Sequence, residues 1–169
     1  MATADTTQDR ILESIRDRLR DRIDEYNEAT CFVSDSPNPL LIPPGDEFCV
    51  VSLGAGIFPA EFFVGGGANQ LMEDATVVVS PYVQYAIDES GRLEEAILDH
   101  NRGILTRAKL RILRALIRDD WEPEYHGSEL LRDMIRPTQS SAPELLLTQG
   151  GLKFVSLSIT FATPFDWEL

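Results

Sequence analysis

Residues 76–87, TVVVSPYVQYAI, carry the clearest β-strand signal in this sequence. Valine, tyrosine and isoleucine alternate with other β-branched or aromatic residues, so both faces of this strand can pack against the rest of the protein. Pro81 lies in the middle and has no amide hydrogen to donate, which predicts that this position is at a sheet edge or at a bulge. Residues 76–87 are therefore expected to form one strand of the sheet.

Shorter strands are predicted on both sides of this segment. Residues 48–53, FCVVSL, form an apolar run that ends before Gly54. Residues 152–161, LKFVSLSITF, alternate from Val155 onward between apolar side chains at odd positions and small polar ones at even positions, as in a half-buried strand. Residues 145–147 are its expected hairpin partner.

The segments around the strands are rich in proline and glycine. Four prolines fall within residues 29–47, which predicts a connector without regular structure. Residues 62–64 are expected to pair back as a short strand, and residues 65–74 are expected to form a loop. Residues 164–167 are expected to form a short aromatic tail.

Two helices complete the pattern. Isoleucine and leucine recur every four residues over residues 6–26, and Thr6 or Thr7 can cap the first turn. Residues 93–117 follow one apolar stripe, with Gly103 as the point where a kink or a division into two helices is expected.

Together these elements predict an α+β fold: one mixed, mostly antiparallel sheet with helices packed on one side, and a long proline-rich connector at residues 29–47. A chain of 169 residues can bury a proper core, so residues 1–169 are expected to form a single domain. Residues 1–6 are expected to be flexible.

The net charge of −13 is distributed unevenly. Residues 31–91 contain eight acidic residues and no Lys or Arg, whereas residues 102–118 contain six basic residues and no acidic one. A chain this acidic is repelled by the phosphate backbones of nucleic acids. This argues against a protein that binds DNA or RNA in a sequence-specific way. The basic stretch is either a solvated helix face or a docking face for an acidic surface, such as residues 31–91 of a neighbouring copy.

Residues that usually carry catalysis or bind metal form no recognisable constellation. Cys31 and Cys49 are too few for a disulfide framework and are interpreted as small core residues, while His100 and His126 lack partners at a suitable spacing. The glycine turn at residues 54–59 begins like a dinucleotide-binding loop, but a proline stands at the third glycine position. We therefore expect no enzymatic activity, no metal and no cofactor.

The sequence also carries no membrane or export signal that we recognise. Its apolar runs are shorter than a membrane span, and residues 1–10 lack the basic and apolar regions of a secretory signal. An intracellular protein with reduced cysteines and no membrane partner is expected.

The order of the elements resembles a known family. A helix, a proline-containing connector, strands that end in an acidic loop, then helices and a late strand are similar to the tail terminator (tail-completion) proteins in the neck of long-tailed phages. The resemblance lies in architecture and strand character and extends over most of the chain, although the connector at 29–47 and the segment 119–150 are longer than in smaller members. Its segments are FCVVSLG at 48–54, EDATVVVSPYVQYAID at 73–88 and LKFVSLSITFATPFDW at 152–167.

The resemblance implies a structural virion protein of the tail and neck, assembled in the host cytoplasm. In this family a homo-oligomeric ring of six subunits ends polymerisation of the tail tube and provides the surface to which the head connector docks. The implied partners are further copies of the chain, the tail tube protein and head–tail connector or adaptor proteins. DNA would pass through the lumen without specific binding, and no catalytic residue or cofactor is carried over.

Candidate contact residues follow from charge, because a ring of identical chains joins unlike surfaces. Candidate lumen or loop acids are Asp46, Glu47 and Glu61, since acidic side chains repel the phosphates of passing DNA. The candidate subunit-interface residues are Arg102, Arg107, Lys109, Arg111, Arg114 and Arg118, with Glu73 and Asp74.

Two other functions fit the same sequence. One is a different head–tail joining or adaptor protein of the neck. The other is a stand-alone module that binds a small ligand or a protein through its glycine-rich loop and aromatic tail. A ligand-induced rise in Tm would favour the binding module, whereas a defined oligomer without ligand would favour the virion proteins.

Overall fold

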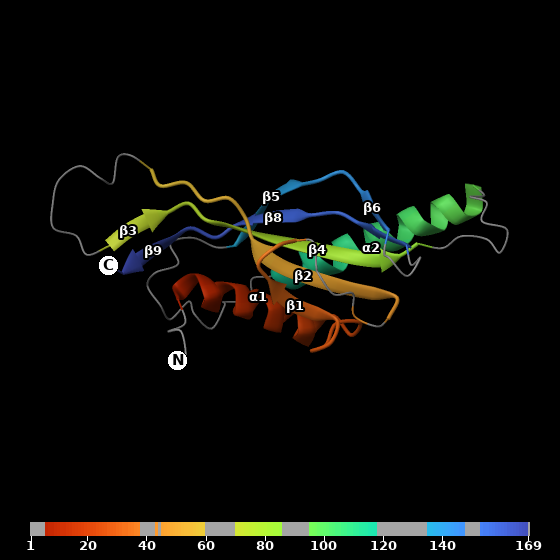
Figure 1. The fold of residues 1–169 in the computed structure, drawn as a ribbon, viewed down its shortest axis with the longest axis horizontal. Coiled ribbons are helices and arrows are strands. Elements are labelled where there is room, and N and C mark those ends of the chain that lie inside the picture. The colour runs from red at the N-terminus through yellow and green to blue at the C-terminus, as the bar shows by residue number, and fades with distance from the viewer. Residues whose placement is uncertain are drawn as a thin grey trace.

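The computed structural model describes residues 6–37, 43, 45–59, 70–85, 95–117, 135–147 and 153–168. Within these residues the chain forms two α-helices and nine β-strands (Figure 1), and the expected α+β fold class is confirmed. In chain order the elements are α1 (Thr7–Arg22), β1 (Cys31–Ser34), β2 (Glu47–Leu53), β3 (Gln70–Glu73), β4 (Thr76–Gln84), α2 (Glu95–Leu116), β5 (Arg136–Ser140), β6 (Glu144–Leu147), β7 (Lys153–Ser156), β8 (Ile159–Ala162) and β9 (Phe165–Glu168).

The main sheet has seven strands and is built around β4. On one side β4 pairs with β2, and β1 continues the sheet beyond β2 in the only parallel pairing among the described strands. On its other side β4 pairs with β8 and then with β7, which lie end to end. β5 extends the sheet beyond β8, and β6 forms the predicted hairpin with β7. The sheet is therefore mixed and mostly antiparallel, as predicted.

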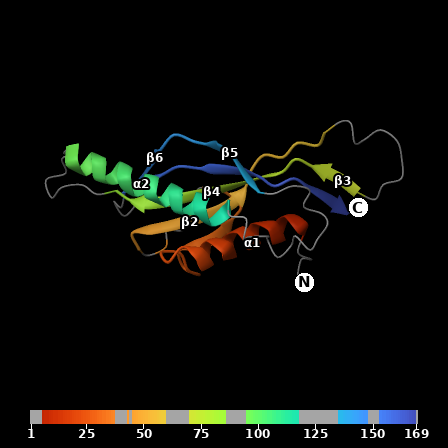
Figure 2. The same ribbon diagram turned by 180° about the vertical axis from the view of Figure 1, so that it is seen from behind.

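Both helices cover the same face of this sheet, as predicted (Figure 2). α1 packs on β1 and β2, and α2 packs on β4 and β7. The larger buried cluster joins the helices to odd-numbered side chains of the central strands, such as Val51 and Val79. The opposite face carries a smaller cluster, in which the ring centroids of Phe48 and Tyr82 stack 4.6 Å apart.

Helix α1 begins where the sequence predicts and ends earlier. Thr6 Oγ1 accepts a hydrogen bond from Asp9 N at 3.2 Å, and Thr6 N donates to Asp9 Oδ2 at 3.1 Å, which completes a capping box. The helix ends at Arg22 because Ile23 has extended backbone angles. Ile23 and Tyr26 are nevertheless buried, so the apolar pattern continued beyond the helix that it predicted.

Pro81 lies in the central strand, so the expectation of an edge position is wrong. Pro81 pairs with Cys49 of β2, and the amide of Cys49 donates to Thr30 O, away from β4. In an antiparallel pair of this kind the backbone nitrogens of both residues point away from each other, so the nitrogen of Pro81 faces β7 and β8 on the other side of β4. There the partner chain is interrupted, because residues 157–158 separate β7 from β8. The expected irregularity therefore exists, but it lies in the chain opposite the proline. For the same reason the strand predicted over residues 152–161 is two strands.

Four strands lie where none was predicted. β1 lies within residues 29–47, so the prediction of an irregular connector is wrong for residues 31–34. β3 lies within the predicted loop at 65–74, β5 covers residues 136–140, and β9 covers most of the predicted tail. Each has only four or five residues and is held by a strand elsewhere in the sequence, a contact that local patterns do not report.

α2 is one helix that runs through Gly103, so the predicted division into two helices is wrong. Its apolar stripe, which includes the buried Leu105 and Ile112, compensates for the glycine by packing on the sheet. The expectations for residues 1–5 and 62–64 lie outside the described residues.

A two-stranded ribbon of β3 and β9 extends beyond the main sheet (Figure 1). β3 leads into β4 and β9 follows β8, so the ribbon continues the β4–β8 pair. Ile57 joins the ribbon through two backbone hydrogen bonds with Asp74, of 3.1 and 2.8 Å. We call residues 54–59, 70–75 and 163–168 the arm.

Two glycines give opposite predictions for a change to alanine. A Cβ on Gly54 would collide with the side chain of Thr76, so Gly54→Ala is expected to lower the free energy of unfolding by about 1–3 kcal/mol. Among the described residues, a Cβ on Gly103 would meet Arg107 Nη1 alone, at 4.0 Å, so Gly103→Ala is expected to raise the free energy of unfolding by about 0.5–1 kcal/mol. Urea unfolding measures both changes, and a destabilised Gly103→Ala variant would contradict a continuous α2.

Candidate assembly surfaces

Arg111 of α2 is the centre of an ion-pair cluster inside the subunit. Its Nη1 lies 2.6 Å from Glu25 Oε1, and its Nη2 lies 2.7 and 2.6 Å from the two carboxylate oxygens of Glu47. Tyr26 also donates to Glu47, at 2.8 Å. The Glu47 side chain is 13% exposed and that of Arg111 is 32% exposed. The cluster therefore ties α2 to the turn after α1 and to the first residue of β2.

This cluster contains two of the predicted candidate residues. Glu47, a candidate lumen or loop acid, begins a strand and is largely enclosed, so it presents little charge to a lumen. Arg111, a candidate interface residue, already has two carboxylate partners in its own chain. The acidic block and the basic stretch do meet here, but within one subunit, because the fold brings Glu47 against α2.

Burial around the cluster shifts pKa values. Burial opposes the charge of Arg111, yet the hydrogen bond and the charge of Glu47 leave the guanidinium pKa above its ordinary value. Burial raises the pKa of the Tyr26 phenol well above its ordinary value, and the neighbouring Cys49 and Glu47 raise it further. Burial likewise raises the pKa of the Cys49 thiol, beside Cys31. Tyr26 and Cys49 therefore stay protonated near neutral pH and are not activated nucleophiles.

The basic residues of α2 lie on two sides of the helix. At about 100° per residue, positions 102 and 109 share one side, and positions 107, 111 and 114 share another. Arg107 and Arg114 are exposed and form no hydrogen bond or ion pair anywhere in the part of the chain that the structure describes. They are the candidate interface cations that remain unpaired on this second side.

The first side of α2 has weaker internal contacts. The Arg102 side chain is 78% exposed and pairs with Asp99 at 2.5 Å, while Lys109 Nζ donates to Ser140 Oγ at 3.0 Å. Arg118 lies outside the described residues. The five predicted cations of α2 that the structure describes thus do not share one surface.

The predicted acids also differ in their surroundings. Glu73 is 8% exposed, and its Oε2 accepts a hydrogen bond from Trp167 Nε1 at 2.6 Å, so it stabilises the arm rather than offering a free charge. Asp74 is exposed next to it, and Asp46 is exposed in the turn before β2. Glu61 lies outside the described residues.

A hollow of about 420 Å³ lies between α2 and the sheet, and we call it the α2 pocket. Leu105, Val155 and Leu157 form its apolar wall, and Arg102 and Lys109 add positive charge. The described lining residues include no Asp or Glu; the others are Tyr85, Thr106, Ser140, Ser141 and Pro143. The sequence does not predict this pocket, because its walls come from segments far apart in the chain. The basic stretch at residues 102–118 was the one related feature in the sequence.

The arm exposes apolar side chains that sequence reasoning also missed. Ile57 is 68% exposed and Phe58 is 46% exposed, and Leu53 at the end of β2 is 41% exposed. The sequence does contain a signal for them, because two apolar residues stand side by side in a glycine turn. A turn that is exposed to water does not require apolar side chains at these positions. Leu145 and Leu147 on β6 are likewise more than half exposed.

No model of a known protein family matches this chain, and no curated protein matches it either. Among the described residues, none of the helices has the length and apolar character needed to cross a bilayer. The described side chains likewise include no group of His, Cys, Asp and Glu that could hold a metal ion. Cys31 and Cys49 are buried core residues, as predicted, whereas His100 is exposed on α2. His126 lies outside the described residues.

The Arg111 cluster is expected to be structural. Arg111→Met leaves the enclosed Glu47 carboxylate without its cation, so the free energy of unfolding should fall by about 1–3 kcal/mol. Arg107→Met, on a residue that is exposed and has no partner among the described residues, should change the free energy of unfolding by less than about 0.5 kcal/mol. Urea unfolding of the dissociated subunit compares the two, and equal stabilities would rule out a structural cluster.

Alkaline pH is expected to destabilise the fold through Tyr26. The pKa of Tyr26 in the folded state is raised above its unfolded value of about 10. Its contribution to the free energy of unfolding is therefore complete below about pH 10 and is lost as the pH rises above that value. The loss should reach about 1.4 kcal/mol per pH unit for this one group. Tyr26→Phe removes this part of the slope and leaves the parts due to Cys49, which begins at lower pH, and to Tyr82, whose pKa is also raised by burial. Equal slopes in the two proteins, from urea unfolding at a series of pH values, would contradict the prediction.

Proposed function

We propose that this chain is a structural protein of the phage neck, a tail terminator whose ring caps the tail tube and offers a docking surface to the head connector. The observation that carries the proposal is the pair Arg107 and Arg114. Both are exposed and unpaired among the described residues of a chain with a net charge of −13. A second copy supplies the acidic surface that would stabilise these cations.

The edges of the main sheet support assembly from unlike surfaces. At one edge β1 has a parallel neighbour, and at the other β5 and β6 have antiparallel ones. Every residue of β5 is exposed, and β6 exposes two leucines. An interface between different patches of identical chains is head to tail, and it generates a ring when its rotation closes.

Charge supports a ring through which DNA passes. Asp46, one of the predicted lumen acids, is exposed, and the chain as a whole repels phosphate. A wall of this sign would let DNA slide without holding it. The same features fit another adaptor ring of the neck.

A stand-alone binding module is the second candidate, and the α2 pocket is the observation that favours it. Its volume of about 420 Å³ lies within the usual range for small-molecule sites, and its apolar wall and two cations suit an apolar acid. A rise in Tm with such a ligand, in a chain that remains monomeric, would favour this function over the ring.

The native mass over a range of protein concentrations tests the proposed ring. Six copies of an 18.9 kDa chain give about 113 kDa. We expect this species in solution or on added tail tubes, where it should also stop the tubes from lengthening. A chain that stays monomeric at high concentration and leaves tube length unchanged would contradict the proposed function.

Charge reversal tests the cations that carry the proposal. Arg107→Glu with Arg114→Glu should weaken assembly by at least about tenfold at low salt, because both positions would then face acids of the neighbouring copy. Arg10→Glu, on an exposed residue of α1, is the matched control and should assemble as the unmodified chain does. Equal assembly of all three proteins would exclude the second side of α2 from the interface.

A further inference from the structure

We propose that the α2 pocket of one copy receives Ile57 and Phe58 from the arm of the next copy. We call these two residues the arm corner. This inference rests on the proposed ring and names one contact within it.

The backbone of the arm corner is fixed before any contact forms. Ile57 exchanges two backbone hydrogen bonds with Asp74, and Gly54 N donates to Thr76 O at 2.8 Å. Gly56 lies so close to Glu73 that an added Cβ would collide with its carboxylate. Because the backbone is already ordered, docking would cost little further conformational entropy.

The side chains of this ordered corner remain in water. Ile57 and Phe58 are 68% and 46% exposed, and Leu53 beside them is 41% exposed. An isolated exposed apolar residue needs no explanation, but three within six residues on a fixed backbone form a patch that gains from burial. The arm corner is therefore an exposed apolar surface that would be stabilised by a pocket on another copy.

The α2 pocket has an apolar wall and a volume that suit these side chains. Its wall of Leu105, Val155 and Leu157 is apolar, and its volume of about 420 Å³ can hold an aromatic and an aliphatic side chain. Aromatic side chains placed in such pockets commonly provide most of the energy of an interface. The arm corner supplies one aromatic and one β-branched side chain.

The charges around the two surfaces are also complementary. Arg102 and Lys109 contribute to the pocket, and its described lining includes no acid. The exposed Asp74 pairs with Ile57 through the backbone, and residues 31–91 contain no Lys or Arg. Docking would therefore bring Asp74 towards the cations and would bury no like charges together.

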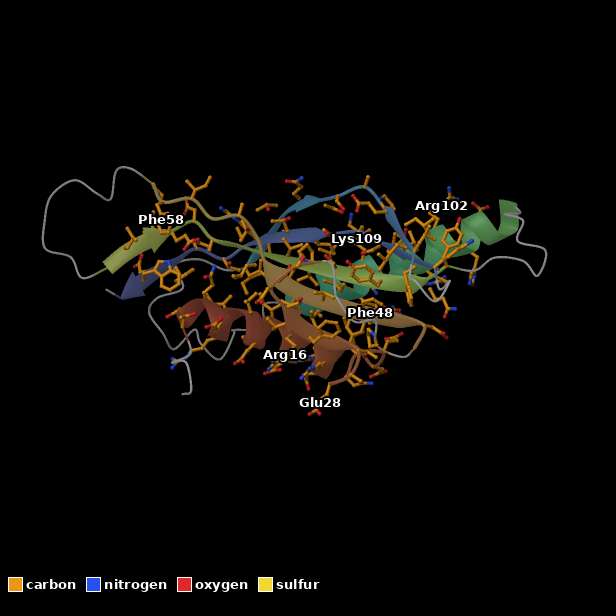
Figure 3. The ribbon with its side chains drawn as sticks, viewed as in Figure 1. Arg16, Glu28, Phe48, Phe58, Arg102 and Lys109 are labelled. Carbon is orange, nitrogen blue, oxygen red and sulfur yellow. The ribbon has the colours of Figure 1, made fainter. Side chains whose placement is uncertain are left out.

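A single chain cannot make this contact with itself. Figure 3 shows Phe58 towards the arm end of the elongated molecule and Arg102 towards the opposite end. The arm corner and the α2 pocket are thus different surfaces of one chain, and their contact must join two copies head to tail. Repeated around a closed ring, it would leave no arm corner and no pocket unoccupied.

Substitutions on both sides of the contact test the proposal. Phe58→Asp places a charge on the arm corner, and Thr106→Trp fills the α2 pocket from an exposed lining position. Each should weaken self-association, measured by sedimentation, by about thirtyfold or more, the size typical of a central contact. The controls Arg10→Asp and Arg10→Trp, at an exposed position of α1, should leave it unchanged.

A charge exchange tests the polar part of the contact. Lys109→Glu and Asp74→Lys should each weaken self-association several-fold, whereas the double variant should recover most of the loss. If the double variant is as weak as the two changes added together, Lys109 and Asp74 do not face each other across the interface.

Cross-linking distinguishes failure of this inference from failure of the ring. Phe58→Cys and Thr106→Cys chains are mixed and treated with a short bismaleimide; the native Cys31 and Cys49 are fully buried and should not react. We expect covalent dimers in the mixture, few in either variant alone, and few in a Phe58→Cys and Arg10→Cys mixture. A hexamer without the 58–106 cross-link would overturn this inference and leave the ring intact.

Two further outcomes would also overturn the inference. A chain that is monomeric at all concentrations and on tube ends would remove both the ring and the contact. A small apolar acid that raises the Tm of the unmodified chain but not of Thr106→Trp, while both assemble equally, would assign the α2 pocket to a ligand instead.

Discussion

The absent amide hydrogen of Pro81 is the constraint around which the sheet is arranged. Because the central strand cannot donate at this position, the chain opposite leaves the ladder at residues 157–158 and continues as two strands. Ser158 there turns to Ser141, with which it exchanges hydrogen bonds of 2.8 and 2.9 Å. Each half of the interrupted chain then has its own edge strand, β6 beside β7 and β5 beside β8.

The α2 pocket follows from this arrangement. Leu157 at the interruption and Ser141 between β5 and β6 both line it, and α2 closes the other side. On the other side of the interruption, β8 continues past β4 into β9 and so builds the arm. One proline in the central strand is thus linked to both surfaces that we propose to meet between copies.

The arginines on the second side of α2 differ in their surroundings. Arg111, Glu25 and Glu47 use opposite charges to fasten α2 to the rest of the subunit, and Tyr26 completes the enclosure of Glu47. Arg107 and Arg114 lie on the same side of the helix and have no such partners among the described residues. Arginines on one side of the same helix are therefore paired within the subunit in one case and unpaired among the described residues in the other.

The amino-acid sequence by itself determined the long elements and their faces. The capping box at Thr6, the apolar stripes of α1 and α2, the strand at residues 76–84 and the alternation from Val155 to Phe161 are local patterns, and burial enforces them directly. Only the tertiary structure decided the short strands β1, β3, β5 and β9, the internal role of Arg111 and Glu73, and the pocket. These depend on which distant segments become neighbours, and neither periodicity nor net charge contains that information.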